Sequence, residues 1–231
     1  MALTLLMPAC TRAAGARLQA RPGSAKGSTK PGTHPLNLRK ERDTLLYVPT
    51  KLRDPAPLVI YLHGATGNEQ QGIRRMGKFA DEFGFLLLSP ASQDYTWESI
   101  RGDYGPDVKI IDQGLTRVFA ENAVDPAKIA VCGFSDGASV ALGLGLSNGD
   151  LLRTILAFSP GFIPSGAEKN GKPRIFISHG DRDEVLPIDQ CSRRIVPDLK
   201  RQGYNVEYKE FSGPHTVPPE TAHDAFAWFL S

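Results

Sequence analysis

Short apolar runs alternate with longer amphipathic segments from Thr44 onward. The runs have the length and residue types of buried strands, and the segments between them repeat apolar residues at helical spacing. Strands that alternate with helices are typical of a mainly parallel sheet, because a parallel connection has to cross over the sheet. The pattern therefore predicts an α/β fold with helices on both faces. The predicted strands are 45–48, 58–62, 86–89, 129–132, 154–158, 175–178 and 206–211, and the predicted helices lie near 73–83, 108–122, 135–146, 188–202 and 219–230.

Length and composition are those of a single folded domain. The chain has 231 residues, of which 41% are hydrophobic, so it can bury one sizeable core without a second domain. Only 15 residues separate Phe158 from Arg174. That connection is too short for a helical cap domain, and we expect any site at the end of the sheet to be open.

The first 40 residues differ from the rest, because they contain seven Lys or Arg and no Asp or Glu. We expect residues 1–40 to be a basic leader or disordered tail and residues 41–231 to form the domain. Three interpretations of the leader are open: an export signal with a small-residue cleavage site at Ala14-Gly15-Ala16, an organellar transit peptide, or a plain extension. Export is favoured over the other two.

The domain without this leader is acidic, with 20 Lys or Arg against 25 Asp or Glu. This balance argues against nucleic acid or an anionic membrane as a partner. The apolar run from Leu3 to Ala9 is too short to span a bilayer, so no membrane insertion is expected. The three cysteines do not have metal-ligand spacing, and no metal site is predicted. None of these features predicts an oligomeric state.

A G-x-S-x-G pattern stands at residues 133–137, directly after the predicted strand 129–132 and before a small-residue helix. This context places Ser135 on a sharp strand-to-helix turn, the position of a nucleophile elbow. Such a turn brings strand and helix nearly into contact and needs minimal side chains, which Gly133 and Gly137 supply. The alternative is an ordinary glycine-containing turn with a surface serine.

A serine hydroxyl is a weak nucleophile and needs a base together with an acid that orients the base. Asp181 and Asp183 follow the strand 175–178, and His215 follows the strand 206–211. The order Ser, Asp, His is that of α/β-hydrolases. Both aspartates are candidates for the acid, with Asp183 preferred, and the alternative is that either caps the next helix. The other histidines, at positions 34, 63, 179 and 223, are interpreted as tail, loop or helix-surface residues.

Two backbone N–H groups are needed to hold the oxyanion that forms on attack. We predict that Asp136, after the serine, and Ala65, in the glycine-containing loop after strand 58–62, supply them. Trp97 and Phe162 each follow a predicted strand and are candidate residues of the substrate pocket. Packing in the core is the alternative for both.

Four motifs occur in a fixed order along the chain: LHGATGN (62–68), GFSDG (133–137), HGDRDEVLP (179–187) and GPHTVPPE (213–220). Together they resemble the phospholipase/carboxylesterase branch of the α/β-hydrolase superfamily. They are also similar to feruloyl-esterase and polyhydroxybutyrate-depolymerase-like esterases. The resemblance covers about residues 43 to 231 and implies that this region is an α/β-hydrolase catalytic domain. It also implies that the triad acid is Asp183, the second Asp of HG-x-x-D, and that His215 is the base.

The resemblance implies a serine hydrolase that cleaves carboxylic esters through an acyl-enzyme, with a small-molecule ester as substrate and no cofactor. We expect short-chain or aromatic esters to be preferred. The alternatives are an acyl-thioesterase, lysophospholipase or peptidase on the same scaffold, or a non-catalytic binding protein. Asp136 stands where acyl-protein thioesterases usually have Gln. A carboxylate beside a developing oxyanion is unfavourable unless it points away, which argues against a thioesterase.

Overall fold

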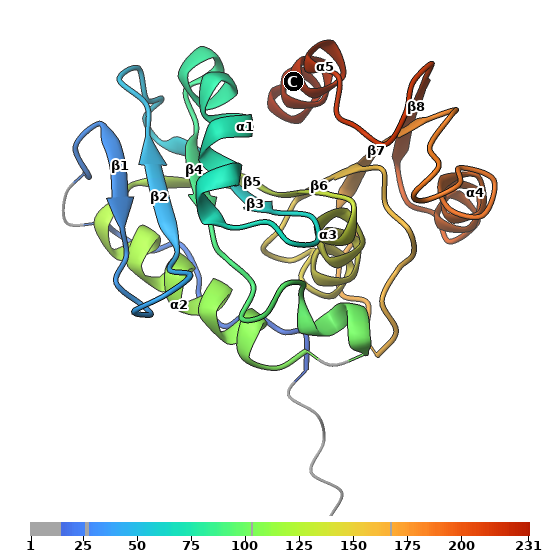
Figure 1. Cartoon of the computed structure of the whole chain (residues 1–231). Coiled ribbons are helices and arrows are strands. Elements are labelled where there is room, and N and C mark those ends of the chain that lie inside the picture. The colour runs from blue at the N-terminus through green and yellow to red at the C-terminus, as the bar shows by residue number, and fades with distance from the viewer. Residues whose placement is uncertain (1–14, 26–27, 103, 167) are drawn as a thin grey trace, which may run out of the picture.

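The computed structural model describes residues 15–25, 28–102, 104–166 and 168–231. An eight-stranded sheet in the order β1-β2-β4-β3-β5-β6-β7-β8 runs through these residues (Figure 1). The first two pairings, β1 with β2 and β2 with β4, are antiparallel and the others are parallel, which confirms the predicted sheet. The strands are β1 (Gly32–Pro35), β2 (Leu45–Val48), β3 (Ala56–Leu62), β4 (Leu86–Ser89), β5 (Val124–Phe134), β6 (Thr154–Phe158), β7 (Arg174–Gly180) and β8 (Val206–Phe211).

Helices cover both faces of the sheet, as the sequence predicts (Figure 1). Two of them, α1 and α5, lie on one face, and α2, α3 and α4 lie on the other. Amphipathic α1 ends at Gly84, whose left-handed backbone (φ 72°) suits a residue without a side chain. The helices of the described residues are α1 (Glu69–Phe83), the short 3-10 helix η1 (Glu98–Arg101), α2 (Pro106–Glu121), α3 (Asp136–Ser147), α4 (Ser192–Arg201) and α5 (Pro219–Leu230).

Two apolar clusters form the core, one on each side of the sheet. Successive side chains of a strand point to opposite faces, so β3 contributes Leu58, Ile60 and Leu62 to one cluster and Val59 and Tyr61 to the other. Every residue of β3 is buried. A continuous apolar strand of this kind is what a parallel sheet covered on both faces requires.

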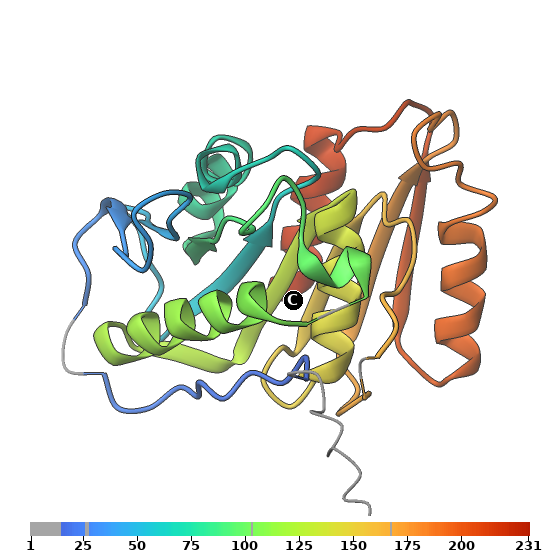
Figure 2. The ribbon, with the colours of Figure 1, turned by 60° about the horizontal axis from the view of Figure 1, so that its bottom comes forward.

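Part of the expected leader packs on the domain, which differs from the sequence expectation for residues 1–40. Leu18 is buried in the core cluster, and its N–H donates to the side-chain oxygen of Asn148 at 2.8 Å. Arg17 forms an ion pair with Asp150 (2.9 Å), and Figure 2 shows this N-terminal segment running along α2 toward the end of α3. Ala16, Leu18 and Ala20 belong to the apolar core cluster, and polar contacts bind the backbone of the segment. The segment is short and also contains basic residues, so its apolar residues did not predict a part of the domain. Residues 1–14 and 26–27 lie outside the described residues.

Strand β1 is the second part of that range which belongs to the domain. Its four residues pair with β2 and form the edge of the sheet. The sequence of β1 has no apolar alternation, so the hydrophobic pattern predicts no strand there. Within the described part of the chain, no helix is long and apolar enough to cross a bilayer.

Candidate active site

Ser135 lies on the sharp turn between β5 and α3. Its backbone has φ 58° and ψ −122°, a strained conformation for a residue with a side chain. A Cβ atom on Gly133 would collide with the carbonyl oxygen of Gly137, and one on Gly137 would collide with that of Leu62. Both glycines are therefore required for the close approach of strand and helix. The local geometry is that of the predicted elbow.

Asp183 and His215 are brought together from two loops at the carboxyl ends of β7 and β8. His215 Nδ1 lies 2.5 Å from Asp183 Oδ2, and the Asp183 side chain is fully buried. The other carboxylate oxygen accepts the N–H groups of Val185 (3.0 Å) and Leu186 (2.8 Å). Because a carboxylate can only accept, Nδ1 carries the proton and Nε2 of the neutral ring keeps its lone pair.

Asp181 contacts the backbone of the loop after β8, whereas Asp183 contacts the side chain of His215. Its Oδ1 accepts the N–H of Gly213 at 3.0 Å, and the N–H of Arg182 donates to the carbonyl of Gly213 at 3.0 Å. A Cβ on Gly180 would collide with that same carbonyl oxygen. These contacts hold the loop that carries His215 close against the end of β7.

The ring of Phe134 packs against His215 beside the turn that carries Ser135. Phe134 directly precedes Ser135, and its ring lies 4.7 Å from the His215 ring, centroid to centroid. Within the described residues the Ser135 hydroxyl and His215 are not hydrogen-bonded. Catalytic hydrogen bonds often tighten only when substrate is bound.

The loop after β3 lies beside Ser135, as the predicted oxyanion site requires. A Cβ on Gly64 would be 3.3 Å from the Ser135 Cβ. The N–H groups of Thr66 and Gly67 donate to Tyr95 (2.7 Å) and Gly64 (3.0 Å), respectively, whereas the exposed Ala65 N–H has no partner among the described residues. The Asp136 N–H is the first of α3 and has no carbonyl to accept it within the helix. Both predicted donors are therefore available.

A second loop, residues 90–98 (the clamp loop), packs against residues 63–68, the loop that carries the predicted oxyanion donor Ala65. Thr96 Oγ1 donates to Asp136 Oδ2 at 2.6 Å, so this carboxylate is held by the clamp loop. Arg42 reaches across to the carbonyl oxygens of Gly67 (2.9 Å) and Ser92 (2.7 Å). Sequence reasoning missed Thr96 and Arg42, because no motif or periodicity connects them to the site.

The two pocket candidates lie in different environments. Trp97 is only 1% exposed, and its Nε1–H donates to the backbone carbonyl of His63 at 2.8 Å. It therefore packs in the core against the loop after β3, which is the alternative that the sequence left open for this residue. Phe162 is 43% exposed, which leaves its ring accessible at the end of β6.

Two buried histidines contact residues of the site from the core. His63 Nε2 accepts the N–H of Ser92 (3.0 Å), so its Nδ1–H donates to the carbonyl of Gly64 (2.7 Å). Burial lowers the pKa of His63 to about 4. His179 contacts Leu186, Ser192 and, at 3.2 Å, Asp183 Oδ2, and burial also lowers its pKa.

We expect the free energy of unfolding to fall as the pH is lowered from about 6.5, the pKa of a histidine in the unfolded chain, to about 4. In this window the unfolded chain takes up a proton that folded His63 does not, which costs up to about 3 kcal/mol. His179 acts in the same direction. Urea titrations at pH 6.5 and 5 measure the change, and His63→Gln should reduce it. An unchanged pH dependence of the unfolding free energy in the His63→Gln variant would contradict the assignment.

No group of three or more His, Cys, Asp or Glu in the described part of the chain is arranged to hold a metal ion. Among the described residues, the geometry thus combines a strained serine, a hydrogen-bonded Asp–His pair and two N–H groups without a hydrogen-bond partner, all at one end of the sheet.

Comparison with known proteins identifies a matching family. Residues 108–228 match the family model described as Phospholipase/Carboxylesterase. Feruloyl esterase C of Emericella nidulans is 29% identical over 105 residues, a match that covers 45% of this chain and only 37% of the relative. The chain thus matches little more than a third of that curated relative.

Solved structures share the fold. Esterase PE8 is 25% identical, with a TM-score of 0.66 over 80% of this chain and 96% of its own. A truncated carbohydrate esterase from gut microbiota has a TM-score of 0.71 at 16% identity, over 92% and 98% of the two chains. The latter likeness concerns the fold alone. The family model covers more than half of the chain and includes the predicted serine, aspartate and histidine. The chain therefore belongs to the phospholipase/carboxylesterase family of the α/β-hydrolase fold.

Proposed function

We propose that the protein is a serine hydrolase that cleaves carboxylic esters through an acyl-enzyme. The observation that carries the proposal is the 2.5 Å hydrogen bond between His215 and Asp183, next to a serine held at φ 58° on the strand-to-helix turn. Family membership and the names of the relatives, which are esterases, support it.

In the proposed reaction, Ser135 Oγ attacks the ester carbonyl carbon while His215 Nε2 takes the hydroxyl proton. Asp183 holds the ring in the required tautomer and stabilises the imidazolium. The N–H groups of Ala65 and Asp136 donate to the oxyanion. His215 then gives the proton to the departing alkoxide as the C–O bond breaks. Water cleaves the acyl-enzyme by the same steps and releases the carboxylic acid.

The loops around the site favour short-chain or aromatic esters. The exposed large hydrophobic residues of the described chain are Tyr95 (58%), Phe162 (43%) and Val185 (65%). All three lie on loops that follow β4, β6 and β7, at the end of the sheet that carries Ser135. Residues 159–166 and 168–173 contain no helix or strand. Within the described residues no cap covers this rim of separate apolar side chains, which offers a ring or short chain a contact but does not enclose a long chain.

We expect 4-nitrophenyl acetate and butyrate to be hydrolysed with higher kcat/KM than the palmitate, because an open rim buries few methylenes of a long chain. A fluorophosphonate probe should label the protein once per chain, at Ser135. Acyl-thioesters and aminoacyl anilides in the same panel test the thioesterase and peptidase alternatives. Absence of labelling and turnover in folded protein would favour a binding protein instead.

A further inference from the structure

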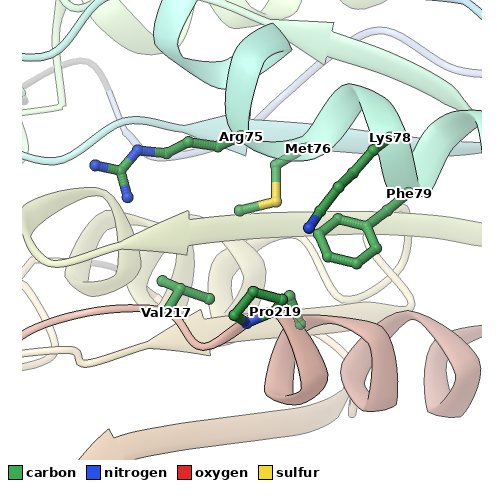
Figure 3. A pocket seen from close by; sticks show the side chains of 7 residues that line it. Arg75, Met76, Lys78, Phe79, Val217 and Pro219 are labelled. Carbon is green, nitrogen blue, oxygen red and sulfur yellow. The ribbon is translucent and has the colours of Figure 1, made fainter. Parts of the chain in front are cut away.

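A small groove lies between α1 and the start of α5, with a volume of about 80 Å³. Figure 3 shows Arg75, Met76, Lys78 and Phe79 of α1 above it and Val217 and Pro219 below. Apolar atoms form much of the lining, and two cationic side chains come from one helix. A cavity of about 10–15 Å³ already admits one water molecule, so the groove has room for a small charged group such as a carboxylate.

The groove is adjacent to the proposed catalytic histidine. Val217, which forms its lower wall, is two residues after His215. The guanidinium carbon of Arg75 lies 5.3 Å from the centroid of the Phe134 ring. The same ring lies 4.7 Å from the ring of His215. Arg75 and His215 thus pack against one aromatic side chain.

The two cations of the groove have no counter-charge within the described residues. Arg75 and Lys78 are exposed, and neither has a carboxylate of those residues within salt-bridge distance, although each lies over an aromatic ring. Several other arginines do have such partners: Arg17 pairs with Asp150, and Arg193 with Asp189 and Glu210. Stacking on Phe134 holds the Arg75 guanidinium in place while its N–H donors remain available to a carboxylate or phosphate.

We propose that this groove binds an anionic group on the alcohol half of the substrate ester. The inference rests on the proposed function, in which His215 returns the proton to the leaving alcohol. The alcohol half must therefore pass beside His215, and the groove, which Arg75 and Val217 line, lies next to this histidine. The substrate class is then the ester of a short or aromatic acid with an alcohol that carries a negative charge.

The test compares two esters of similar shape and different charge, 4-acetoxybenzoate and its neutral near-isostere 4-acetoxybenzamide. Both transfer the same acetyl group to Ser135. Arg75→Gln should lower kcat/KM for the anionic ester relative to the amide by about fivefold, the effect of a partly screened ion pair. Arg75→Lys should keep most of the preference for the anionic ester over the amide, because lysine keeps the positive charge. Added salt should reduce this preference in the wild-type protein.

Arg74→Gln is the matched control, because it removes the same charge from the preceding position of α1, which does not line the groove. This variant should leave the ratio of the two kcat/KM values, anionic ester to amide, near the wild-type ratio. An equal decrease in both arginine variants would mean a general field effect, and an unchanged ratio in Arg75→Gln would overturn the subsite. Failure of the wild type to cleave either ester, together with failure of fluorophosphonate labelling, would instead contradict the proposed function itself.

Discussion

Replacement of Ser135 by alanine should lower ester turnover by about a thousandfold or more, because the members of a catalytic triad act as one unit. The variant should remain folded, since alanine removes only one oxygen and leaves the glycines of the turn in place. Initial rates with 4-nitrophenyl butyrate measure the effect, and circular dichroism with thermal unfolding checks the fold.

Ser147→Ala is the matched control for this variant. Ser147 is at the other end of α3, where its hydroxyl donates to the carbonyl of Gly143 at 3.0 Å. It should retain full turnover. A folded Ser135→Ala protein that still hydrolyses the ester would refute Ser135 as the nucleophile. Loss of turnover in both variants would mean that any disturbance of α3 abolishes activity, which would also contradict the assignment.

Asp183→Asn should lower kcat by about a thousandfold or more, whereas Asp181→Asn should lower it less than about tenfold. An amide in place of the Asp183 carboxylate favours the wrong tautomer of His215, and it does not balance the charge on the imidazolium. An amide in place of the Asp181 carboxylate keeps a side-chain oxygen that can accept the Gly213 N–H, which Asp181 accepts now at 3.0 Å. Steady-state kinetics of both purified variants measure the difference. The reverse ranking would mean that the acid of the triad is misassigned.

The sequence predicted those parts of the molecule that depend on local pattern. Apolar runs located seven strands, and the glycines around Ser135 predicted the turn because only minimal side chains allow it. The order of the motifs along the chain indicated the serine, aspartate and histidine of a triad. The residues alone did not decide whether Asp181 or Asp183 is its acid, since both follow the same strand. The hydrogen bond from His215 to Asp183 supports the assignment that the family resemblance implies.

Features that depend on contacts between distant segments were not predicted. Thr96 holds Asp136 across 40 positions, and Trp97 is in the core because its indole reaches the carbonyl of His63. Neither contact leaves a periodic signal in the sequence. Composition also assigned residues 1–40 to a leader or tail, although β1 pairs with β2 and the segment around Leu18 packs on the domain through apolar and backbone contacts.

The packing of Leu18 limits where a protease can shorten the chain without harm. Leu18, Ala16 and Ala20 are part of the main apolar cluster, and the side chain of Asn148 bonds the backbone of both Ala16 and Leu18. Loss of Leu18 alone would uncover apolar surface worth about 2 kcal/mol. A maturation cut compatible with the fold therefore falls before Ala16. Trimming at residue 40, where composition changes, would remove an edge strand and part of the core.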